Sequence, residues 1–484
     1  MFENCVYGLL FVTLRAELCK TNCNSIEKMA EKAKFATKIG LVAATVGSAI
    51  GLGNVWRFPG EAQTNGGAAF LMIYVICVLI LGIPVMLAEF SLGRAGQSDA
   101  VGNFKALTPR KKWWIAGAIG LCASYLILSY YLVVAGWTVD YLYSSITGSL
   151  YDGYGAGDAS FFAGKMSEVI TSVTSPIFWT IVTLLINLVV LILGVQKGIE
   201  KISNVLMPVL FVLLLIICVK SLLLPNSMEG VKFFLKPDFG KISVDVALNA
   251  LGQAFYSLSL GMGILVTYSA YFPKESNLTH TAVQVSVLDF VVAFMMGLII
   301  FPAVCSFNMG NSVQTEGTTL VFVTMPEIFA NMWGTQLWSV LFFLLLAIAA
   351  ITSTISLGEV AVSFVSDRLS VSRRWACLIV VLPLFVLSPI CSLSLGAVPG
   401  IQVGGMSLFD FLDTFATNLL LPLCALLTCV YVGWVLPKDF ISKELTNGGR
   451  LSTKGLTVIK FLIRYVSPVL IMLIFVFKVV DTLR

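Results

Sequence analysis

Apolar runs of about twenty or more residues recur along almost the whole chain. A membrane-spanning helix needs roughly 20 apolar residues, and we expect eleven such spans, near residues 38–64, 67–95, 113–146, 176–195, 200–223, 241–272, 277–307, 337–368, 374–396, 407–436 and 456–481. These runs are too long for the strands of a transmembrane barrel and do not alternate as such strands do. The residues are 58% hydrophobic and 12% charged, which excludes a soluble globular protein. The sequence therefore predicts an all-α polytopic membrane protein.

Basic residues gather between particular spans. "RAGQSDAVGNFKALTPRKKWW" separates the second and third spans, "SDRLSVSRR" the eighth and ninth, and "KDFISKELTNGGRLSTKG" the tenth and eleventh. These stretches and the lysines before the first span fall on one side, which the positive-inside rule makes the cytoplasm. We expect a multi-pass protein of the inner (plasma) membrane, with its N-terminus in the cytoplasm and its C-terminus outside. Because the net charge is only +5, no nucleic-acid partner is expected.

The cysteines and the single histidine limit which metal-binding and catalytic sites the chain could form. The 11 cysteines are scattered, mainly in apolar runs, without metal-type spacing. Cys305 and Cys391 fall near the predicted outer face, where either a disulfide or free buried thiols would fit. The only histidine, His280, cannot form a metal or catalytic cluster by itself, and no enzyme is expected. Residues 1–30 fit neither a span nor a signal peptide; we expect a disordered or interfacial extension, or a misassigned start.

Glycine and polar residues interrupt two of the expected spans. The stretch "VGSAIGLGNVWRFP", residues 46–59, breaks the first span, and "YSLSLGMG", residues 256–263, breaks the sixth. Each broken span opens a set of five, and the sets start on opposite sides, which predicts a 5+5 inverted repeat with a binding site at the breaks. A kink or close-packing glycines would be the alternative. The expected parts are a cytoplasmic N-terminal segment (1–35), a first repeat (36–225), a second repeat (226–437), and the eleventh span with its preceding cytoplasmic loop (438–484).

Six motifs carry a family resemblance: "GSAIGLGNVWRFP", "NGGAAF", "GIPVMLAEFSLGR", "LSYYLVVAGW", "GQAFYSLSLGMG" and "AAITSTISLGE". From about Lys32 onward the chain resembles the neurotransmitter:sodium symporter family, and in particular its bacterial amino-acid transporters with the leucine-transporter fold. The resemblance implies sodium-coupled uptake of an amino acid or a related amine by alternating access. A bacterial member of this family is the standard example of broken-helix transporters, so this architecture is implied by the resemblance.

The resemblance also implies a substrate site at the two breaks. A broken helix presents free N–H groups at one new end and free carbonyls at the other, which suits the two charges of an amino-acid zwitterion. The carboxylate would meet the amides of Leu52 and Gly53 and the Tyr131 hydroxyl, and the ammonium the carbonyls of Ala49 and Tyr256. The implied substrate-binding residues are Ser48, Ala49, Leu52, Gly53, Ile127, Tyr131, Tyr256, Ser257, Ser259, Met262, Ser353 and Leu357. Taken alone, Ile127 and Leu357 would be ordinary core residues.

Two sodium sites follow from the same resemblance, since Na⁺ prefers several oxygen ligands. The first would use the Ala49 carbonyl, Asn54, Ser257 and Asp289, completed by the substrate carboxylate. The second would use the carbonyls of Gly47, Ile50 and Ala349 and the hydroxyls of Thr352 and Ser353. The shared carboxylate would couple sodium and substrate binding. Taken alone, the two hydroxyls would be back-bonded within their helix, whereas a carboxylate inside an apolar run indicates a functional site by itself.

The family's gate positions are matched less completely. Arg57 and Asp413 match the outer pair, with Asp410 as a competing assignment. At the inner gate Tyr268 and Asp367 fit, but Lys32 and Phe35 stand where the family usually has arginine and tryptophan. Lysine lacks the two-pronged geometry of arginine, so this gate is expected to be looser. Gly198 and Pro208 have a spacing that allows local unwinding in some relatives, or they are an ordinary helix-start glycine and proline.

The last expectations concern the substrate and chloride. Gly51 stands where monoamine carriers usually have aspartate, which favours a substrate with its own carboxylate, and the flexible Met262 favours a bulky or aromatic hydrophobic amino acid. The family's chloride positions match Tyr74, Gln253, Ser257 and Ala293, but Asp289 supplies a fixed negative charge one turn before Ala293. We expect two Na⁺ sites and no chloride requirement. A transporter of another small zwitterion or amine, or a ligand-sensing receptor on the same fold, is the alternative.

Overall fold

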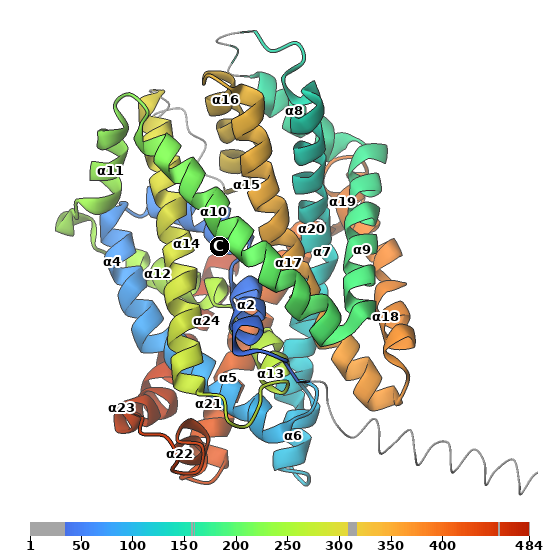
Figure 1. The fold of residues 1–484 in the computed structure, drawn as a ribbon, viewed down its shortest axis with the longest axis vertical. Helices are drawn as coiled ribbons and strands as arrows, with labels where there is room; N and C mark the ends of the chain where they lie inside the picture. Colours follow the sequence, from blue (N-terminus) through green and yellow to red (C-terminus); the bar gives the residue numbers. More distant parts are fainter. Residues whose placement is uncertain (1–33, 156–157, 159, 308–316, 454, 484) are drawn as a thin grey trace, which may run out of the picture. The chain divides into compact units, whose positions relative to one another are not determined.

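Helices make up nearly all the regular structure in this computed structural model, which describes residues 34–155, 158, 160–307, 317–453 and 455–483. Residues Phe35–Arg484 form one compact unit, and its elements are described here (Figure 1). In the first half they are α2 (Lys38–Ala49), η1 (Gly53–Arg57), α3 (Phe58–Thr64), α4 (Ala68–Cys77), η2 (Val78–Gly82), α5 (Ile83–Gly96), α6 (Gly102–Leu107), α7 (Trp114–Thr147), η3 (Ser149–Tyr151), α8 (Phe161–Thr171), α9 (Thr174–Gly194), η4 (Val195–Glu200), α10 (Lys201–Leu222), α11 (Ser227–Leu235) and η5 (Phe239–Lys241).

The second half continues with one short hairpin among helices. Its elements are α12 (Val244–Ser257), α13 (Ile264–Ser269), α14 (Leu278–Ser306), α15 (Gly317–Thr319), η6 (Leu320–Thr324), α16 (Met325–Ala330), α17 (Thr335–Leu369), α18 (Arg373–Val381), α19 (Leu384–Ser394), β1 (Gln402–Val403), β2 (Met406–Ser407), α20 (Leu408–Thr414), η7 (Phe415–Leu420), α21 (Leu421–Val430), η8 (Tyr431–Val435), α22 (Phe440–Leu445), α23 (Leu456–Phe461), η9 (Leu462–Val466) and α24 (Ser467–Leu483). The two strands pair antiparallel.

Many of these helices are long and apolar enough to cross a bilayer. Among the described residues there are eight, or nine when the bent pair α2 and η1–α3 counts as one span. This confirms a polytopic helical membrane protein. The predicted count of eleven would also require the continuous stretch Thr174–Leu222 to divide at Gly194, where φ is 88°, and α12–α13 to form one broken span. That count, the inverted repeat and the boundaries of the four parts remain predictions.

The first break falls where the glycine-rich stretch predicts it. α2 ends at Ala49, the backbone of Ile50 is extended (ψ 99°), and helix resumes at Gly53 with a bend of 54°. Thr37 caps the start of α2, because its side chain accepts the Gly40 N–H at 2.9 Å. The break therefore separates a short capped helix from the rest of its span and leaves backbone groups free on both sides.

The second break lies between α12 and α13. Ser259, Gly261 and Gly263 all have positive φ, at 53°, 76° and 70°. At Gly261 a Cβ would also collide with the Leu421 carbonyl on α21, so glycine is required there for two reasons. The chain therefore leaves the helical path completely for several residues before Ile264 begins α13.

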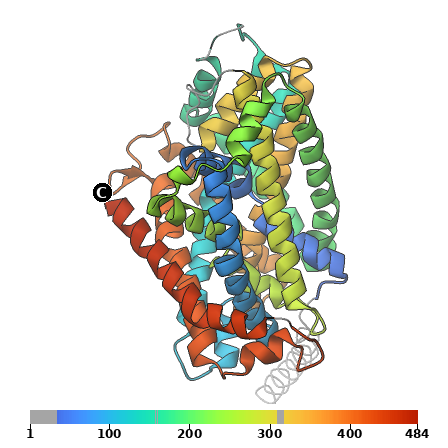
Figure 2. The ribbon, with the colours of Figure 1, turned by 90° about the vertical axis from the view of Figure 1, so that its left-hand side faces the viewer.

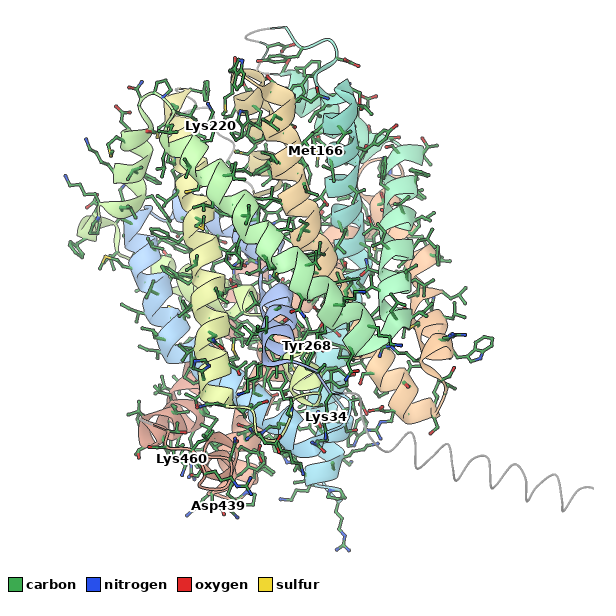
Figure 3. The ribbon with its side chains drawn as sticks, in the orientation of Figure 1. Lys34, Met166, Lys220, Tyr268, Asp439 and Lys460 are labelled. Carbon is green, nitrogen blue, oxygen red and sulfur yellow. The ribbon has the colours of Figure 1, made fainter. Side chains whose placement is uncertain are left out.

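Packing places the helices beside the two breaks, α2 and α13, against several other helices, with α13 contacting α5, α17 and α2. The long helix α7 packs along α17 and α9, and α2 contacts α10, α14 and α17 (Figure 1). In contrast, α24 runs obliquely along the outside (Figure 2), and only 22% of the residues in the apolar window of Leu456–Val480 are buried. Met166 and Lys220 lie toward one end of the bundle, whereas Asp439 and Lys460 lie toward the other; Tyr268 lies between the helices (Figure 3).

Candidate functional site

A cavity of about 30 Å³ lies where the two breaks meet α7 and α17. Its lining residues are Ser48, Ala49, Gly51, Gly53, Ile127, Tyr131, Tyr256, Ser257, Ser259, Met262, Ile264, Ser353 and Leu357. The structure thus brings together every sequence-predicted substrate residue except Leu52, and it adds Gly51 and Ile264. Both additions follow from the breaks themselves, since Gly51 lies within the first and Ile264 is the first residue after the second. The volume holds on the order of two water molecules, so a larger ligand could enter only if the walls moved apart.

Leu52 takes part in the site through its backbone. Its N–H donates to the Tyr131 hydroxyl oxygen at 2.9 Å. Because the Tyr131 hydroxyl keeps its own hydrogen, it could donate to a ligand beside the same N–H. At the end of α2, the Ser48 carbonyl accepts the Ser259 hydroxyl at 2.9 Å. The cavity therefore has a donor-rich part and a carbonyl-rich part within one apolar enclosure, an arrangement that is complementary to a zwitterion.

Asp289 is the centre of a fully buried polar cluster. Its side chain is 0% exposed, and its carboxylate accepts hydrogen bonds from Asn54 Nδ2 at 2.7 Å, Ser257 Oγ at 2.8 Å and the Tyr74 hydroxyl at 3.3 Å. Ser257 Oγ also lies 3.1 Å from Asn54 Oδ1. Described residues bring no cationic side chain into this cluster. A carboxylate with oxygen neighbours and no cation partner is the kind of environment that can accept a small hard cation.

The second predicted cation group lies between α2 and α17. Ser353 Oγ lies 3.4 Å from the Ile50 carbonyl, and Thr352 Oγ1 lies 2.9 and 3.1 Å from the carbonyls of Ile348 and Ala349. A Cβ on Gly47 would lie 3.5 Å from Thr352 Cβ, so α2 approaches α17 closely here. The Thr352 hydroxyl is back-bonded within α17, as expected of threonine in helices, whereas the Ser353 hydroxyl reaches across to the Ile50 carbonyl in the first break.

At the outer-gate positions the predicted pair is separated. Arg57 lies 3.8 Å from Glu61 and over the Tyr256 ring, 4.6 Å from its centroid. Asp413 accepts the Tyr130 hydroxyl at 2.7 Å, and no ion pair joins Arg57 to Asp413 in the described part of the chain. Asp410, the competing assignment, is exposed and hydrogen-bonds Ser407 at the start of α20. The geometry favours Asp413 over Asp410 as the acid beside the site.

The predicted inner-gate residues lie in different surroundings. Lys32 lies outside the described residues. Phe35 is buried against Tyr268 in an edge-to-face contact at 6.0 Å, and its N–H donates to the Tyr271 carbonyl at 3.1 Å. Tyr268 donates to Ser356 at 2.8 Å, while Asp367 accepts the Asp99 backbone N–H at 3.0 Å. Phe35 and Tyr268 therefore form one packed unit, and Asp367 lies in a different set of contacts.

The structure gives Glu359 a set of partners that the sequence does not reveal. This buried carboxylate accepts Arg373 Nη2 at 2.5 Å, Arg373 Nη1 at 3.1 Å and the Tyr271 hydroxyl at 2.7 Å. Arg373 Nε also donates to the Leu191 carbonyl at 2.6 Å. Through these contacts the Glu359–Arg373 ion pair connects α17 and α18 to α9 and to the segment after α13. An acid within an apolar run predicts a partner, but only the fold identifies which one.

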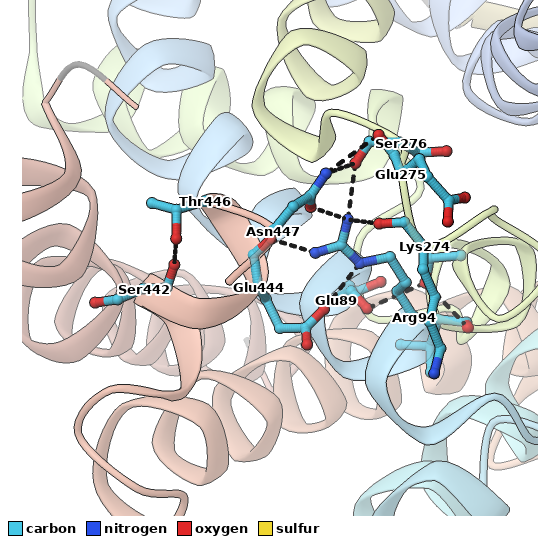
Figure 4. Close-up of polar contacts among 11 residues, drawn as sticks. Glu89, Arg94, Lys274, Glu275, Ser276, Ser442, Glu444, Thr446 and Asn447 are labelled. Atoms are coloured by element: carbon cyan, nitrogen blue, oxygen red, sulfur yellow. Dashed lines mark hydrogen bonds and ion pairs between the residues drawn. The ribbon is translucent and has the colours of Figure 1, made fainter. Parts of the chain in front are cut away.

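A second buried acid, Glu89, supports the second break directly. Its side chain is 1% exposed, and Oε1 accepts the Gly261 N–H at 2.8 Å. At the end of the same helix, α5, the buried Arg94 guanidinium binds Glu444, Asn447 and the carbonyls of Lys274 and Ser276 (Figure 4). These contacts fix the segment after α13 and the helix α22 to α5. Glu89 and Arg94 therefore hold the chain on either side of α13, at Gly261 before it and at Lys274 and Ser276 after it.

Comparison with known proteins gives a consistent result. The family model described as "Sodium:neurotransmitter symporter family" matches residues 32–155 and 156–483. An uncharacterized sodium-dependent transporter of Bacillus subtilis, YhdH, is 36% identical over 442 residues, covering 91% of this chain and 96% of its own. The sodium-dependent serotonin transporter of Drosophila melanogaster is 28% identical over 493 residues, covering 94% and 76%.

A solved structure agrees with the sequence relatives. The crystal structure of MhsT in complex with L-phenylalanine superposes with a TM-score of 0.83 at 36% identity, covering 92% of this chain and 99% of the other. The similarity thus extends over nearly the full length of both chains.

Proposed function

This chain belongs to the sodium:neurotransmitter symporter family, whose members are sodium-coupled transporters and not enzymes, and from this premise we propose that it takes up a hydrophobic amino acid together with two Na⁺ ions by alternating access. The observation that carries the proposal is the cavity at the two breaks, whose surroundings include both the Leu52 N–H with the Tyr131 hydroxyl and the carbonyl at the end of α2. An α-amino acid presents the two charges that these groups complement.

In the proposed complex the substrate carboxylate accepts the hydrogen bond of the Leu52 N–H, which donates to the Tyr131 hydroxyl in this structure. The Tyr131 hydroxyl can then donate to the same carboxylate, and Gly53 adds a second backbone N–H. The ammonium lies at the carbonyls of Ala49 and Tyr256. Backbone dipoles of this kind bind both charges without a charged side chain in the cavity, which suits a site that must also release its ligand.

The proposed sodium sites flank this position. The first comprises the Ala49 carbonyl, Asn54, Ser257, Asp289 and the substrate carboxylate, and the second comprises Gly47, Ile50, Ala349, Thr352 and Ser353. The short distances within the Asp289 cluster support the first, and the approach of Ile50 to Ser353 supports the second. Since the substrate carboxylate is also a sodium ligand, binding of each raises the affinity for the other.

A bulky or aromatic substrate is favoured by the cavity walls. Ile127, Met262, Ile264 and Leu357 provide apolar surface, and Met262 can change rotamer to accommodate different shapes. The similar structure of MhsT contains L-phenylalanine, which is consistent with a large side chain. We propose eleven spans in the inner membrane, with the end of the bundle that holds α6 and α22 in the cytoplasm.

Uptake into proteoliposomes with a panel of amino acids tests this proposal. We expect accumulation of at least one of leucine, methionine, phenylalanine, tyrosine and tryptophan with an inward sodium gradient, and none when potassium replaces sodium. Uptake of a small zwitterion or an amine alone would support the alternative substrate class. Sodium-dependent binding without uptake would indicate a receptor on this fold.

A further inference from the structure

Glu200 is a buried acid whose partners lie at the start of α2. It ends η4, immediately before α10, and is 4% exposed. Its Oε2 accepts the Ala36 N–H at 2.8 Å, and its Oε1 accepts the Thr37 N–H at 3.0 Å and the Thr37 hydroxyl at 2.8 Å. Three hydrogen bonds therefore connect one carboxylate to two consecutive residues more than 160 positions earlier in the chain.

The chemistry of a helix start explains why a carboxylate lies there. The first N–H groups of a helix have no acceptor within it, and the positive end of the helix dipole favours an anion. Thr37 satisfies the Gly40 N–H from within α2, and Glu200 satisfies the N–H groups of Ala36 and Thr37. Hydrogen bonds to an ionised acceptor are stronger than neutral ones, so this contact holds α2 against α10 at a defined position.

Gly40 makes the approach possible. A Cβ at this position would occupy the space of the Glu200 side chain, colliding with Cγ, Cδ and Oε1. The contact thus depends on two separate features, an acid at the start of α10 and a glycine in the first turn of α2. Each can be altered without touching the cavity between the breaks.

The other end of α2 carries the backbone groups proposed to bind sodium. α2 is one uninterrupted helix of 12 residues from Lys38 to Ala49, so a tilt of the helix at its start would displace the carbonyls of Gly47 and Ala49 at its end. α10, which carries Glu200 at its start, packs directly against α2 (Figure 1). A shift at the predicted cytoplasmic end of α2 would therefore reach the carbonyls proposed for both sodium sites.

We propose that Glu200 is a positioning residue that clamps α2 in the closed arrangement and so makes sodium binding depend on closure of the predicted cytoplasmic side. Opening toward the cytoplasm requires α2 to leave the carboxylate, which moves the sodium ligands apart and lowers sodium affinity at the moment of release. The sodium part of this inference rests on the proposed function, whereas the clamp itself does not.

Hydrogen exchange of residues 36–49 in lipid nanodiscs tests the clamp without any transport assay. We expect Glu200→Ala to raise the exchange rates of this segment by roughly tenfold or more, and Glu200→Gln, which keeps one acceptor, to raise them less. Gly40→Ala should act like Glu200→Ala, and the double variant should show no further increase, since both remove the same contact. Glu229→Gln, on the exposed face of α11, is the matched control and should leave the segment unchanged.

The sodium concentration for half-maximal amino-acid binding tests the coupling. We expect it to rise several-fold in Glu200→Ala and Gly40→Ala, because fewer molecules have the ligands in place, and to stay constant in Glu229→Gln. Unchanged exchange in folded Glu200→Ala and Gly40→Ala would overturn the clamp. Faster exchange with unchanged sodium dependence would overturn the coupling. If the unsubstituted protein bound no amino acid in sodium, the proposed function would fail, and the exchange result would still decide the clamp.

Discussion

Ser257, the last residue of α12, donates its hydroxyl to the Asp289 carboxylate of α14 at 2.8 Å. This contact joins the helix that precedes the second break to the helix that carries the buried acid. Asn54, just after the first break, binds the same carboxylate at 2.7 Å. Residues beside both breaks therefore bind the same Asp289 carboxylate, so a substitution of Asp289 would remove a contact from each of them.

Replacing Gly51 with aspartate should abolish amino-acid binding. A Cβ at Gly51 would lie 2.7 Å from Ser353 Oγ and 2.9 Å from the Tyr131 hydroxyl, and the added carboxylate would repel that of the substrate in a site of low dielectric constant. We expect a loss of affinity of roughly 100-fold or more in a sodium-dependent binding assay. Gly51→Ala separates the effect of size from that of charge and should lose less. Full affinity in Gly51→Asp would show that the carboxylate binds elsewhere.

Replacing Thr352 and Ser353 together with alanine should weaken sodium binding. Both hydroxyls lie among carbonyls of α2 and α17, so their loss removes two proposed oxygen ligands. We expect the sodium concentration for half-maximal uptake to rise about tenfold, equivalent to about 1.4 kcal/mol. Thr354→Ala is a suitable control, because Thr354 is back-bonded to Ile351 in the same helix. The second site would be misassigned if the double variant had the sodium dependence of the parent.

The sequence predicts the two breaks well and the partners of the buried acids poorly. Glycines and short polar residues inside apolar runs locate the breaks, because their effect on the backbone is local. Glu89, Glu200 and Glu359 are visible in the sequence as acids, but their partners Gly261, Thr37 and Arg373 follow from packing between separate segments of the chain. No spacing rule connects Glu89 to Gly261 or Glu200 to Thr37. Glu359 and Arg373 are 14 positions apart, across a helix end and a turn, so this spacing does not identify a pair either. The resemblance left all three pairings unassigned.

Replacing Arg373 with lysine should destabilise the protein although the charge is kept. The guanidinium uses three nitrogens at once, two on Glu359 and one on the Leu191 carbonyl, and lysine cannot reproduce this fork. We expect a loss of about 1–3 kcal/mol from the group left without a partner, measured as thermal unfolding in detergent. Arg374→Lys, at an exposed neighbouring position, should change stability by less than about 0.5 kcal/mol. Equal behaviour of the two variants would contradict the proposed importance of the fork.

Replacing Glu89 should show whether the second break needs an acceptor or a charge. Glu89→Gln keeps an oxygen for the Gly261 N–H, whereas Glu89→Ala leaves that buried N–H without its acceptor, at a cost of about 1–3 kcal/mol. We expect glutamine to preserve amino-acid binding and alanine to reduce it, with faster hydrogen exchange in residues 258–263. Glu168→Gln, on the exposed side of α8, controls for the loss of an acid. If glutamine were as damaging as alanine, the charge itself would be required.

The final prediction is that transport does not require chloride. Tyr74 and Ser257, at two of the family's chloride positions, donate their hydroxyls to Asp289 at 3.3 and 2.8 Å. The fixed carboxylate therefore accepts the hydrogen bonds that a bound chloride ion would otherwise accept. Ala293, one turn later, is fully buried and offers no polar group. Two Na⁺ ions and a neutral zwitterion carry +2, and Asp289 offsets one unit, which lowers the cost of holding cations away from water.

Uptake into proteoliposomes with gluconate replacing chloride on both sides measures this directly, and we expect the rate to stay within about twofold, a change of less than about 0.5 kcal/mol. Asp289→Asn provides the complementary test, because it removes the charge while keeping an oxygen. If the carboxylate replaces the anion, this variant should lose activity in gluconate and regain part of it in chloride, since a diffusible anion could then approach Tyr74 and Ser257. A large loss of rate in the unsubstituted protein that added chloride restores would contradict the prediction and would mean that these hydroxyls still bind the anion.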